Sequence, residues 1–146
     1  WVMWSQSLDN MLDDALAELH GTPHADDDVV LDRLGQSIMD SHAIRLLGHR
    51  QLAKQQRGLV PAEQSILKLM GSEAQQDLAA LILETLGAAA LDQTVDSTLR
   101  FPYETDRGAV SWSDRYLFTF AGTISGGTSE IQRNIVAEQV LGLPRG

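Results

Sequence analysis

The chain has 146 residues, of which 43% are hydrophobic and 21% are charged, and it contains no cysteine. This composition is ordinary for a globular protein and excludes disulfides, thiolate metal sites and a cysteine nucleophile. The net charge of −9 argues against a nucleic-acid-binding protein, because such proteins carry a basic stripe. No apolar run approaches the roughly 20 residues that a membrane-spanning helix needs, and the lack of cysteine fits a reducing cytoplasm.

Apolar residues recur at steps of three and four through the first part of the chain, which predicts amphipathic helices. One helix is expected over residues 4–21. A second is expected over 26–56, where three consecutive aspartates supply N-cap oxygens, and a third over 61–87, where a proline stands in the first turn. The second and third helices should be antiparallel neighbours, because the connection between them is very short.

The pattern breaks over residues 88–110, which are expected to form a loop, and helical spacing returns over 113–123 and 128–142. No strand and no internal repeat is expected. The sequence therefore predicts an all-α, up-and-down bundle of four to five helices that forms a single domain over residues 1–146. The residues expected on inward faces include Leu8, Met11, Leu12, Ala15, Leu16 and Leu19, then Val30, Leu31, Leu34, Ile38, Ile44 and Leu47, then Leu67, Met70, Leu78, Leu81 and Ile82, and finally Ile131, Val140 and Leu141, with Tyr116, Leu117 and Phe120 sharing one side of the fourth helix.

The stretch Ser125–Glu130, SGGTSE, connects the last two expected helices. Gly122, Gly127 and Ser129 have the spacing of a P-loop, but Thr128 stands where the lysine should be and no strand precedes the glycines. Two interpretations remain open. The stretch is either an anion-binding helix start with outward N–H groups, or an ordinary capped turn in which Thr128 or Ser129 is the N-cap.

No metal site is predicted from the four histidines of the chain. His42 and His49 lie seven residues apart on one expected helix, and they have no third ligand within reach in the sequence. The aspartates at 26–28 lack the alternation and the glycine of an EF-hand loop.

Two segments resemble the acyl-CoA dehydrogenase family. GGTSEIQRNIVAEQVLG resembles the closing segment of that family, in which a glycine, Thr-Ser-Glu or Thr-Ser-Gln, an aliphatic residue and Gln-Arg begin the last helix. SILKLMGSEAQQDLAALILETLG is similar to a family helix with a Ser-x-x-Lys-Leu beginning and a Gln-x-x-Gly end. The resemblance implies the C-terminal helical domain of a longer flavoenzyme chain, which converts an acyl-CoA thioester to a 2-enoyl-CoA with FAD as hydride acceptor.

The resemblance also implies which residues contact the cofactor. One group would bind FAD at the start of the last helix, and a second group would reach the FAD of a neighbouring subunit, with a glutamate here in place of the family's glutamine. The implied FAD-binding residues are Gly127, Thr128, Ser129 and Glu130 in the first group and Glu84 and Gly87 in the second.

Two departures from the family pattern bear on catalysis. Gly126 occupies the position where many members carry the catalytic glutamate, and the Arg-x-x-Phe-Gly segment between the first two helices is missing. No catalytic base is therefore assigned. In related enzymes the base lies on the first helix, where the nominal candidates are Asp9, Asp13, Asp14 and Glu18, or it would fall upstream of Trp1.

These departures leave two classes of function open. The chain is either the C-terminal domain of an FAD-dependent acyl-CoA dehydrogenase within a homo- or hetero-oligomer, expected as a dimer of dimers, or a catalytically silent structural subunit of a hetero-oligomeric member. An acyl-CoA oxidase is a third and weaker alternative. Fatty acyl and sterol side-chain thioesters are equally open as substrates.

Overall fold

The computed structural model describes residues 2–59, 63–91 and 111–145, and the structural statements below concern those residues. These residues form the α-helices α1 (Val2–Leu19), α2 (Asp28–Gln56), α3 (Gln64–Leu86), α4 (Trp112–Ile124) and α5 (Ser129–Ile135). Three short segments accompany them: the 3₁₀ turns η1 (Pro23–Asp26) and η2 (Gly87–Leu91), and the π-helical η3 (Val136–Val140). None of the helices described is long and apolar enough to cross a membrane.

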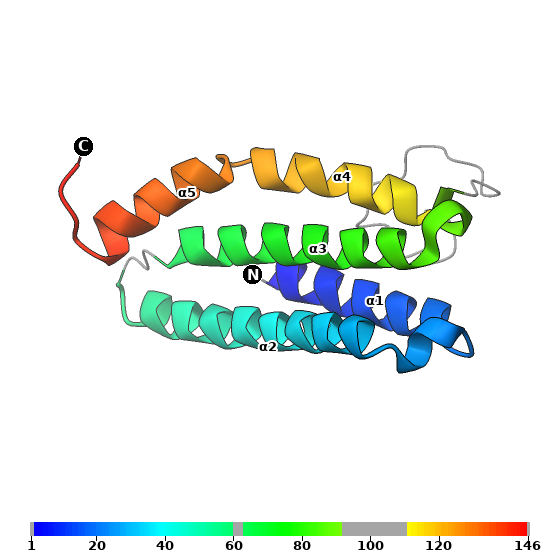
Figure 1. Ribbon diagram of the computed structural model, residues 1–146. Helices are drawn as coiled ribbons and strands as arrows, with labels where there is room; N and C mark the ends of the chain where they lie inside the picture. Colours follow the sequence, from blue (N-terminus) through cyan, green and yellow to red (C-terminus); the bar gives the residue numbers. More distant parts are fainter. Residues whose placement is uncertain (1, 60–62, 92–110, 146) are drawn as a thin grey trace.

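The helices α1 to α4 alternate in direction along the chain, and α5 continues from the end of α4 along the first half of α3 (Figure 1). α3 lies at the centre and contacts each of the other four α-helices. The predicted all-α, up-and-down bundle is confirmed, and no strand occurs in the described ranges. Of the loop predicted over 88–110, the first residues form η2, and 92–110 lie outside the described residues.

The second helix begins where its capping residues predict. Asp27 accepts hydrogen bonds from the N–H groups of Val29 at 2.9 Å and Val30 at 3.2 Å, which satisfies two amides that the helix itself cannot pair. The first residue of α3 in the structure is Gln64, and the start predicted at Pro61 falls outside the described residues.

The core lies between α1, α2 and α3, where apolar side chains from all three helices interlock. Gly71 of α3 lets α1 approach closely, because a Cβ at this position would lie only 2.8 Å from Cγ of Trp4. The largest apolar side chains with no exposed surface are Leu8 of α1, Ile44 of α2, and Leu78 and Ile82 of α3.

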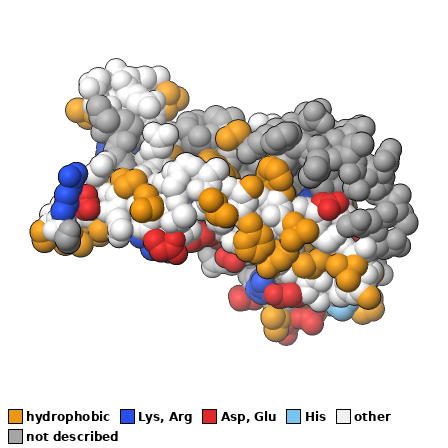
Figure 2. Space-filling model, turned by 90° about the horizontal axis from the view of Figure 1, so that it is seen from above, with side chains coloured by type: hydrophobic (Ala, Val, Ile, Leu, Met, Phe, Trp, Pro, Cys, Tyr) orange, Lys and Arg blue, Asp and Glu red, His pale blue; other side chains and the backbone are white. Residues whose placement is uncertain are grey.

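One apolar face of the bundle has no neighbour within the described chain. Leu117, Phe120 and Ile124 lie three and four residues apart on α4 and are 66%, 41% and 64% exposed. We call these three residues the α4 apolar stripe. Figure 2, which looks down on α4 and α5, shows hydrophobic side chains along this side of the molecule. Contiguous apolar surface of this kind marks an interaction site more often than an ordinary solvated face.

Six apolar residues that were predicted to be buried are exposed in the structure, so this part of the prediction was wrong. The periodicity placed them on inward faces, but no described segment covers them. Past Ile135 the helix widens into η3, which breaks the 3.6-residue period and changes which side chains face inward. The exposed residues that were expected in the core are Leu16, Leu31, Ile38, Ile131, Val140 and Leu141.

Candidate functional site

The turn between α4 and α5 contains the glycine-rich stretch singled out in the sequence. α4 ends at Ile124, and the N–H of its C-cap residue Ser125 donates to the carbonyl of Ala121 at 2.9 Å. Gly126 and Gly127 then adopt φ values of 68° and 102°, a region that residues with a side chain rarely occupy. Thr128 is the N-cap of α5, in an extended conformation and without a side-chain capping hydrogen bond. Both glycines are therefore required by the backbone path of the turn.

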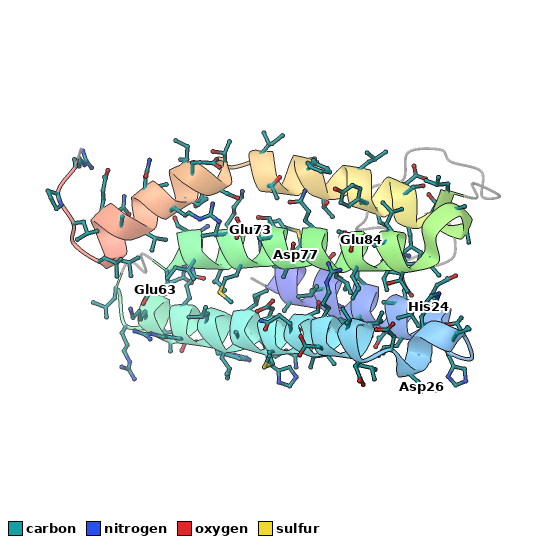
Figure 3. All side chains as sticks on the ribbon, in the orientation of Figure 1. His24, Asp26, Glu63, Glu73, Asp77 and Glu84 are labelled. Carbon is teal, nitrogen blue, oxygen red and sulfur yellow. The ribbon has the colours of Figure 1, made fainter. Side chains whose placement is uncertain are left out.

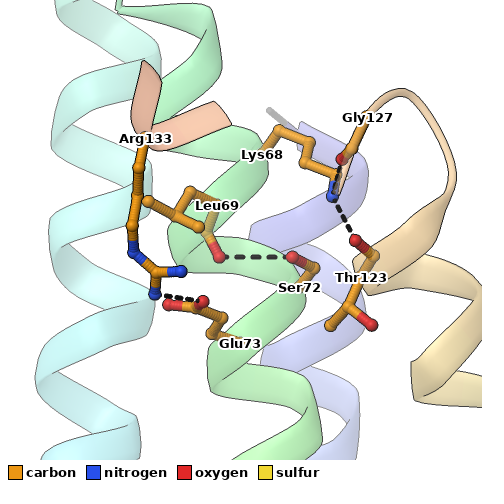
Figure 4. A network of polar contacts seen from close by, with 7 residues as sticks. All are labelled: Lys68, Leu69, Ser72, Glu73, Thr123, Gly127 and Arg133. Carbon is orange, nitrogen blue, oxygen red and sulfur yellow. Dashed lines mark hydrogen bonds and ion pairs between the residues drawn. The ribbon is translucent and has the colours of Figure 1, made fainter. Parts of the chain in front are cut away.

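Two side chains hold the carbonyl groups of this turn on the inner side. The Lys68 ammonium group on α3 donates to the carbonyls of Gly127 at 2.7 Å and Thr123 at 3.0 Å (Figure 4). The buried Gln132 donates its side-chain amide to the carbonyl of Gly126 at 2.6 Å. A Cβ on Gly127 would lie 2.8 Å from that amide nitrogen, so no other residue fits there without displacing Gln132.

The orientation of the carbonyls fixes the orientation of the amides. In a trans peptide the N–H points opposite to the C=O of the preceding residue. The N–H of Gly127 therefore points away from Gln132, and the N–H of Thr128 points away from Lys68 and from α3. Within the described part of the chain no acceptor is found for either N–H. The turn thus presents two donors on its outer side.

Glu130 occupies part of the same helix start. Hydrogen bonding to its own backbone N–H, and then to the Thr128 side chain, lowers the pKa of the Glu130 carboxyl, with a smaller contribution from the charge of Arg133. The carboxylate is ionised at neutral pH and lies near the first turn of α5.

An ion pair joins α5 to α3 close to the turn. Arg133 donates to the Glu73 carboxylate at 2.6 Å, and Figure 4 shows this ion pair beside the Lys68 contacts. Burial lowers the pKa of the Lys68 ammonium group, and the charge of Glu73 partly opposes this. The Gln-Arg pair that follows the Thr-Ser-Glu segment in the sequence thus has two structural roles: Gln132 holds the turn, and Arg133 anchors the helix.

The second group of predicted cofactor-binding residues lies at the opposite end of α3. Glu84 is sixteen residues beyond Lys68, which is roughly 24 Å along a helix, and Figure 3 shows it near the end of α3 away from Glu63. Its carboxylate accepts from Arg33 of α2 at 2.7 Å. Gly87 ends the helix with φ 55° and donates its N–H to the Leu83 carbonyl. Within one chain the two predicted groups do not meet.

The carboxylates considered as bases on α1 are engaged elsewhere or lie in solvent. Asp9 accepts from Ser41 and from Arg45 of α2, the latter at 2.5 Å. Asp14 accepts from Arg115 of α4 at 2.7 Å, and the guanidinium also lies 4.8 Å from the Trp112 ring centroid. The other two candidates, Asp13 and Glu18, are exposed.

Two hollows lie between α1 and α2, away from the turn. One has a volume of about 180 Å³ and is lined by Asp9, Leu12, Asp13, Leu16, Ile38, Ser41 and His42. His42 and His49 are exposed on α2. In the described ranges no three His, Cys, Asp or Glu side chains gather in a way that could hold a metal ion.

Sequence reasoning singled out the turn but missed the two side chains that shape it. Lys68 is 59 positions from Gly127, and no local pattern connects them. The lysine of the Ser-x-x-Lys-Leu segment was the signal that could have found one of them. It stands in a part of the helix predicted to face inward, where an ammonium group needs hydrogen-bond acceptors, and the glycine-rich turn offers carbonyls as acceptors.

Comparison with known proteins agrees with this architecture. The family model for the acyl-CoA dehydrogenase C-terminal domain matches residues 2–141. The acyl-CoA dehydrogenase IpdE1 of Mycolicibacterium smegmatis is 36% identical over 124 residues, which is 85% of this chain and 28% of that protein. IpdE1 of Mycobacterium tuberculosis is 31% identical over 146 residues, 99% of this chain and 33% of that protein. The chain thus spans about a third of the length of these relatives.

Two solved structures have the same fold. The Tcur3481-Tcur3483 steroid ACAD matches with a TM-score of 0.72 at 22% identity, over 95% of this chain and 35% of that one. The ChsE4-ChsE5 complex from Mycobacterium tuberculosis matches with a TM-score of 0.65 at 28% identity, over 97% of this chain and 35% of that one. With the family model covering nearly all of the described helices, the chain belongs to the acyl-CoA dehydrogenase family and corresponds to its C-terminal domain.

Proposed function

We propose that the chain supplies the C-terminal helical domain of an FAD-dependent acyl-CoA dehydrogenase, and that the turn between α4 and α5 contacts the FAD pyrophosphate. The observation that carries the proposal is the direction of the backbone in this turn. The Gly126 and Gly127 carbonyls point inward, so the N–H groups of Gly127 and Thr128 point outward. Outward amides at a helix start favour phosphate, because the N–H groups and the helix dipole both attract negative charge.

Different residues of the turn would contact different parts of FAD, according to the groups that they offer. Gly127 and Thr128 offer amides, and the missing side chains at 126 and 127 let a dinucleotide approach the backbone closely. Ser129 adds a hydroxyl donor. The Glu130 carboxylate would repel a phosphate, but it is suited to accept from a sugar hydroxyl, as acidic residues do at dinucleotide sites.

Glu84 and Gly87 would serve a different FAD from the one at the turn of the same chain. Their separation from Lys68, roughly 24 Å along α3, supports this division. A second flavin implies a second subunit, and the α4 apolar stripe offers a surface for one. The Arg33 guanidinium beside Glu84 offsets part of the negative charge that would otherwise oppose a phosphate. We therefore propose a homo- or hetero-oligomer, organised as a dimer of dimers and located in the cytoplasm.

When bound, FAD supplies the hydride acceptor for α,β-dehydrogenation of an acyl-CoA thioester to a 2-enoyl-CoA. The described residues of this chain hold and orient the cofactor but offer no evident base. Gly126 has no side chain to accept the α-proton, and Asp9 and Asp14 are paired with arginines. We expect the base outside the described residues, on the same polypeptide or on a partner subunit.

A second candidate function is a catalytically silent subunit of a hetero-oligomeric acyl-CoA dehydrogenase. The observations that favour it are Gly126 at the position of the family's glutamate and Glu84 at that of the glutamine. In that case the fold and the apolar stripe are retained for assembly, and a related partner provides the base and the main flavin contacts.

The test is to isolate the protein with its associated subunits under non-denaturing conditions. Flavin is measured by absorbance at about 450 nm, where oxidised flavins absorb, and by FAD released on denaturation. Fatty acyl-CoA and sterol side-chain acyl-CoA thioesters are then assayed with an artificial electron acceptor. We expect FAD in the complex and formation of a 2-enoyl-CoA, and weak FAD binding by the chain alone.

Three outcomes separate the alternatives. If the complex contains FAD, and replacing Gly127 by alanine lowers the FAD content, the leading proposal is supported. Unchanged FAD content and turnover in that variant support the silent subunit. A complex that contains no flavin rejects both candidates, because each places the chain in an FAD-dependent enzyme.

A further inference from the structure

The Lys68 ammonium group has an unusual set of partners for a lysine. It is partly buried and donates to two backbone carbonyls, at 2.7 Å and 3.0 Å, whereas surface lysines usually pair with carboxylates or water. One acceptor, Thr123, lies in the last turn of α4, where the helix dipole is negative. The other acceptor, Gly127, lies in the turn, directly before Thr128, the N-cap residue of α5. One cation therefore links the end of α4 to the turn that leads into α5.

The two contacts act on the turn together with Gln132. Lys68 holds the carbonyl of Gly127, and Gln132 holds the carbonyl of Gly126, so both peptide groups of the diglycine are fixed in orientation. Peptide groups flanked by glycine rotate more easily than others, because no Cβ restricts φ and ψ. Without the two side chains, the outward direction of the amides would be one of several conformations.

We propose that Lys68 is a positioning residue for the cofactor-binding turn. Its ammonium group fixes the carbonyls of Thr123 and Gly127, and so directs the N–H of Thr128 outward, with Gln132 doing the same for the N–H of Gly127. The charge also lies directly behind the turn, where it adds to the positive field that an external anion meets. This inference rests on the proposed contact between the turn and the FAD pyrophosphate.

The test compares three variants in the intact complex. Lys68→Met keeps most of the aliphatic stem and removes the charged donor, and Lys68→Arg keeps a charged donor. Lys54→Met is the matched control, because Lys54 is the other lysine of the chain and pairs with Glu63 at the start of α3 rather than with a carbonyl of the turn. Affinity for FAD is measured by flavin fluorescence, and folding by circular dichroism.

We expect Lys68→Met to weaken FAD binding by at least about tenfold, because both hydrogen bonds from Lys68 to the carbonyls of Thr123 and Gly127 are lost and the N–H of Thr128 is no longer held outward. Lys68→Arg should recover a large part of that affinity, and Lys54→Met should bind as the wild type does. Equal weakening in Lys68→Met and Lys54→Met would mean that lost stability explains the effect, and would overturn the positioning role.

A second readout separates this inference from the proposed function. The ¹⁵N–¹H resonances of Gly127 and Thr128 report the conformation of the turn without any cofactor. If the wild type holds no FAD, the proposed function fails. The positioning role then stands if Lys68→Met shifts these two resonances while Lys54→Met leaves them in place, and it is overturned if neither variant shifts them.

Discussion

Replacing a helical glycine by alanine should have opposite effects on stability at two positions of this bundle. Gly35 lies within α2, and a Cβ added there would meet no heavy atom within 4 Å. Gly71 lies within α3, and a Cβ there would lie 2.8 Å, 2.9 Å and 2.9 Å from Cγ, Cβ and Cδ2 of Trp4. The chemistry of the substitution is the same at both sites, and only the neighbour differs.

The magnitudes follow from two competing effects. Alanine is favoured over glycine in a helix interior by about 0.8–1.0 kcal/mol, and Gly35→Ala should gain close to this amount in free energy of unfolding. Gly71→Ala gains the same propensity, but forcing a methyl group into the packed contact between α3 and Trp4 costs about 1–3 kcal/mol. We therefore expect Gly71→Ala to be less stable than Gly35→Ala by about 1–3 kcal/mol.

Urea unfolding followed by circular dichroism gives both free energies of unfolding. For a chain of this length the expected difference corresponds to roughly 3–9 °C in melting temperature, at about 3 °C per kcal/mol. A double-mutant cycle then isolates the contact: in a Trp4→Ala background, Gly71→Ala should lose its penalty and become as favourable as Gly35→Ala.

Equal stability of the Gly35→Ala and Gly71→Ala variants would refute the reasoning, since it would mean that α1 does not approach α3 as closely as Trp4 and Gly71 indicate. A penalty that persists after Trp4 is removed would also contradict it, because another neighbour would then be responsible.

Gly127→Ala should lower the free energy of unfolding by about 2–3 kcal/mol, because it adds left-handed backbone strain and displaces Gln132. Gly126→Ala has open space around its Cβ and should lower the free energy of unfolding by only about 1–2 kcal/mol. Similar chemical-denaturation midpoints for the two variants would contradict this. The hydrogen bond from Lys54 lowers the pKa of Glu63 below its ordinary value of 4.5. The ionised Glu63 carboxylate therefore contributes stability above pH 4.5, and this contribution is lost as the pH falls through the folded-state pKa. Melting curves of Glu63→Gln should therefore depend less on pH below 4.5 than those of the wild type, and parallel curves would be evidence against the pairing. Asp14→Asn should destabilise the bundle by about 1–2 kcal/mol, because its partner Arg115 is left partly buried, and an unchanged melting temperature would show that the ion pair contributes nothing.

Local signals in the sequence predicted the helices well. The aspartate run at 26–28 placed the start of α2, because side-chain oxygens at a helix start pair with amides only a few residues away. The same holds for the end of α1 near Gly21, which has φ 75°. These interactions join residues close in sequence, so a single sequence is enough to find them.

Two kinds of feature could not be predicted in this way. Leu117 and Ile131 are apolar at helical spacing, but periodicity identifies an apolar face without saying whether this chain or another molecule covers it. The contacts of Lys68 and Gln132 with the diglycine depend on how α3, α4 and α5 pack, and no rule of spacing contains that information. The glycine spacing located the turn, the resemblance to the family implied its ligand, and the packing of these helices explains its shape.

The α4 apolar stripe has a consequence for how the protein is handled in the cell. A newly made copy exposes two aliphatic side chains and one aromatic side chain along one edge until something covers them. Molecules synthesised in excess of their partners would present this edge to one another, which favours precipitation. We therefore expect overproduction of this chain alone to yield less recoverable material than balanced co-production with the subunits that pack against it.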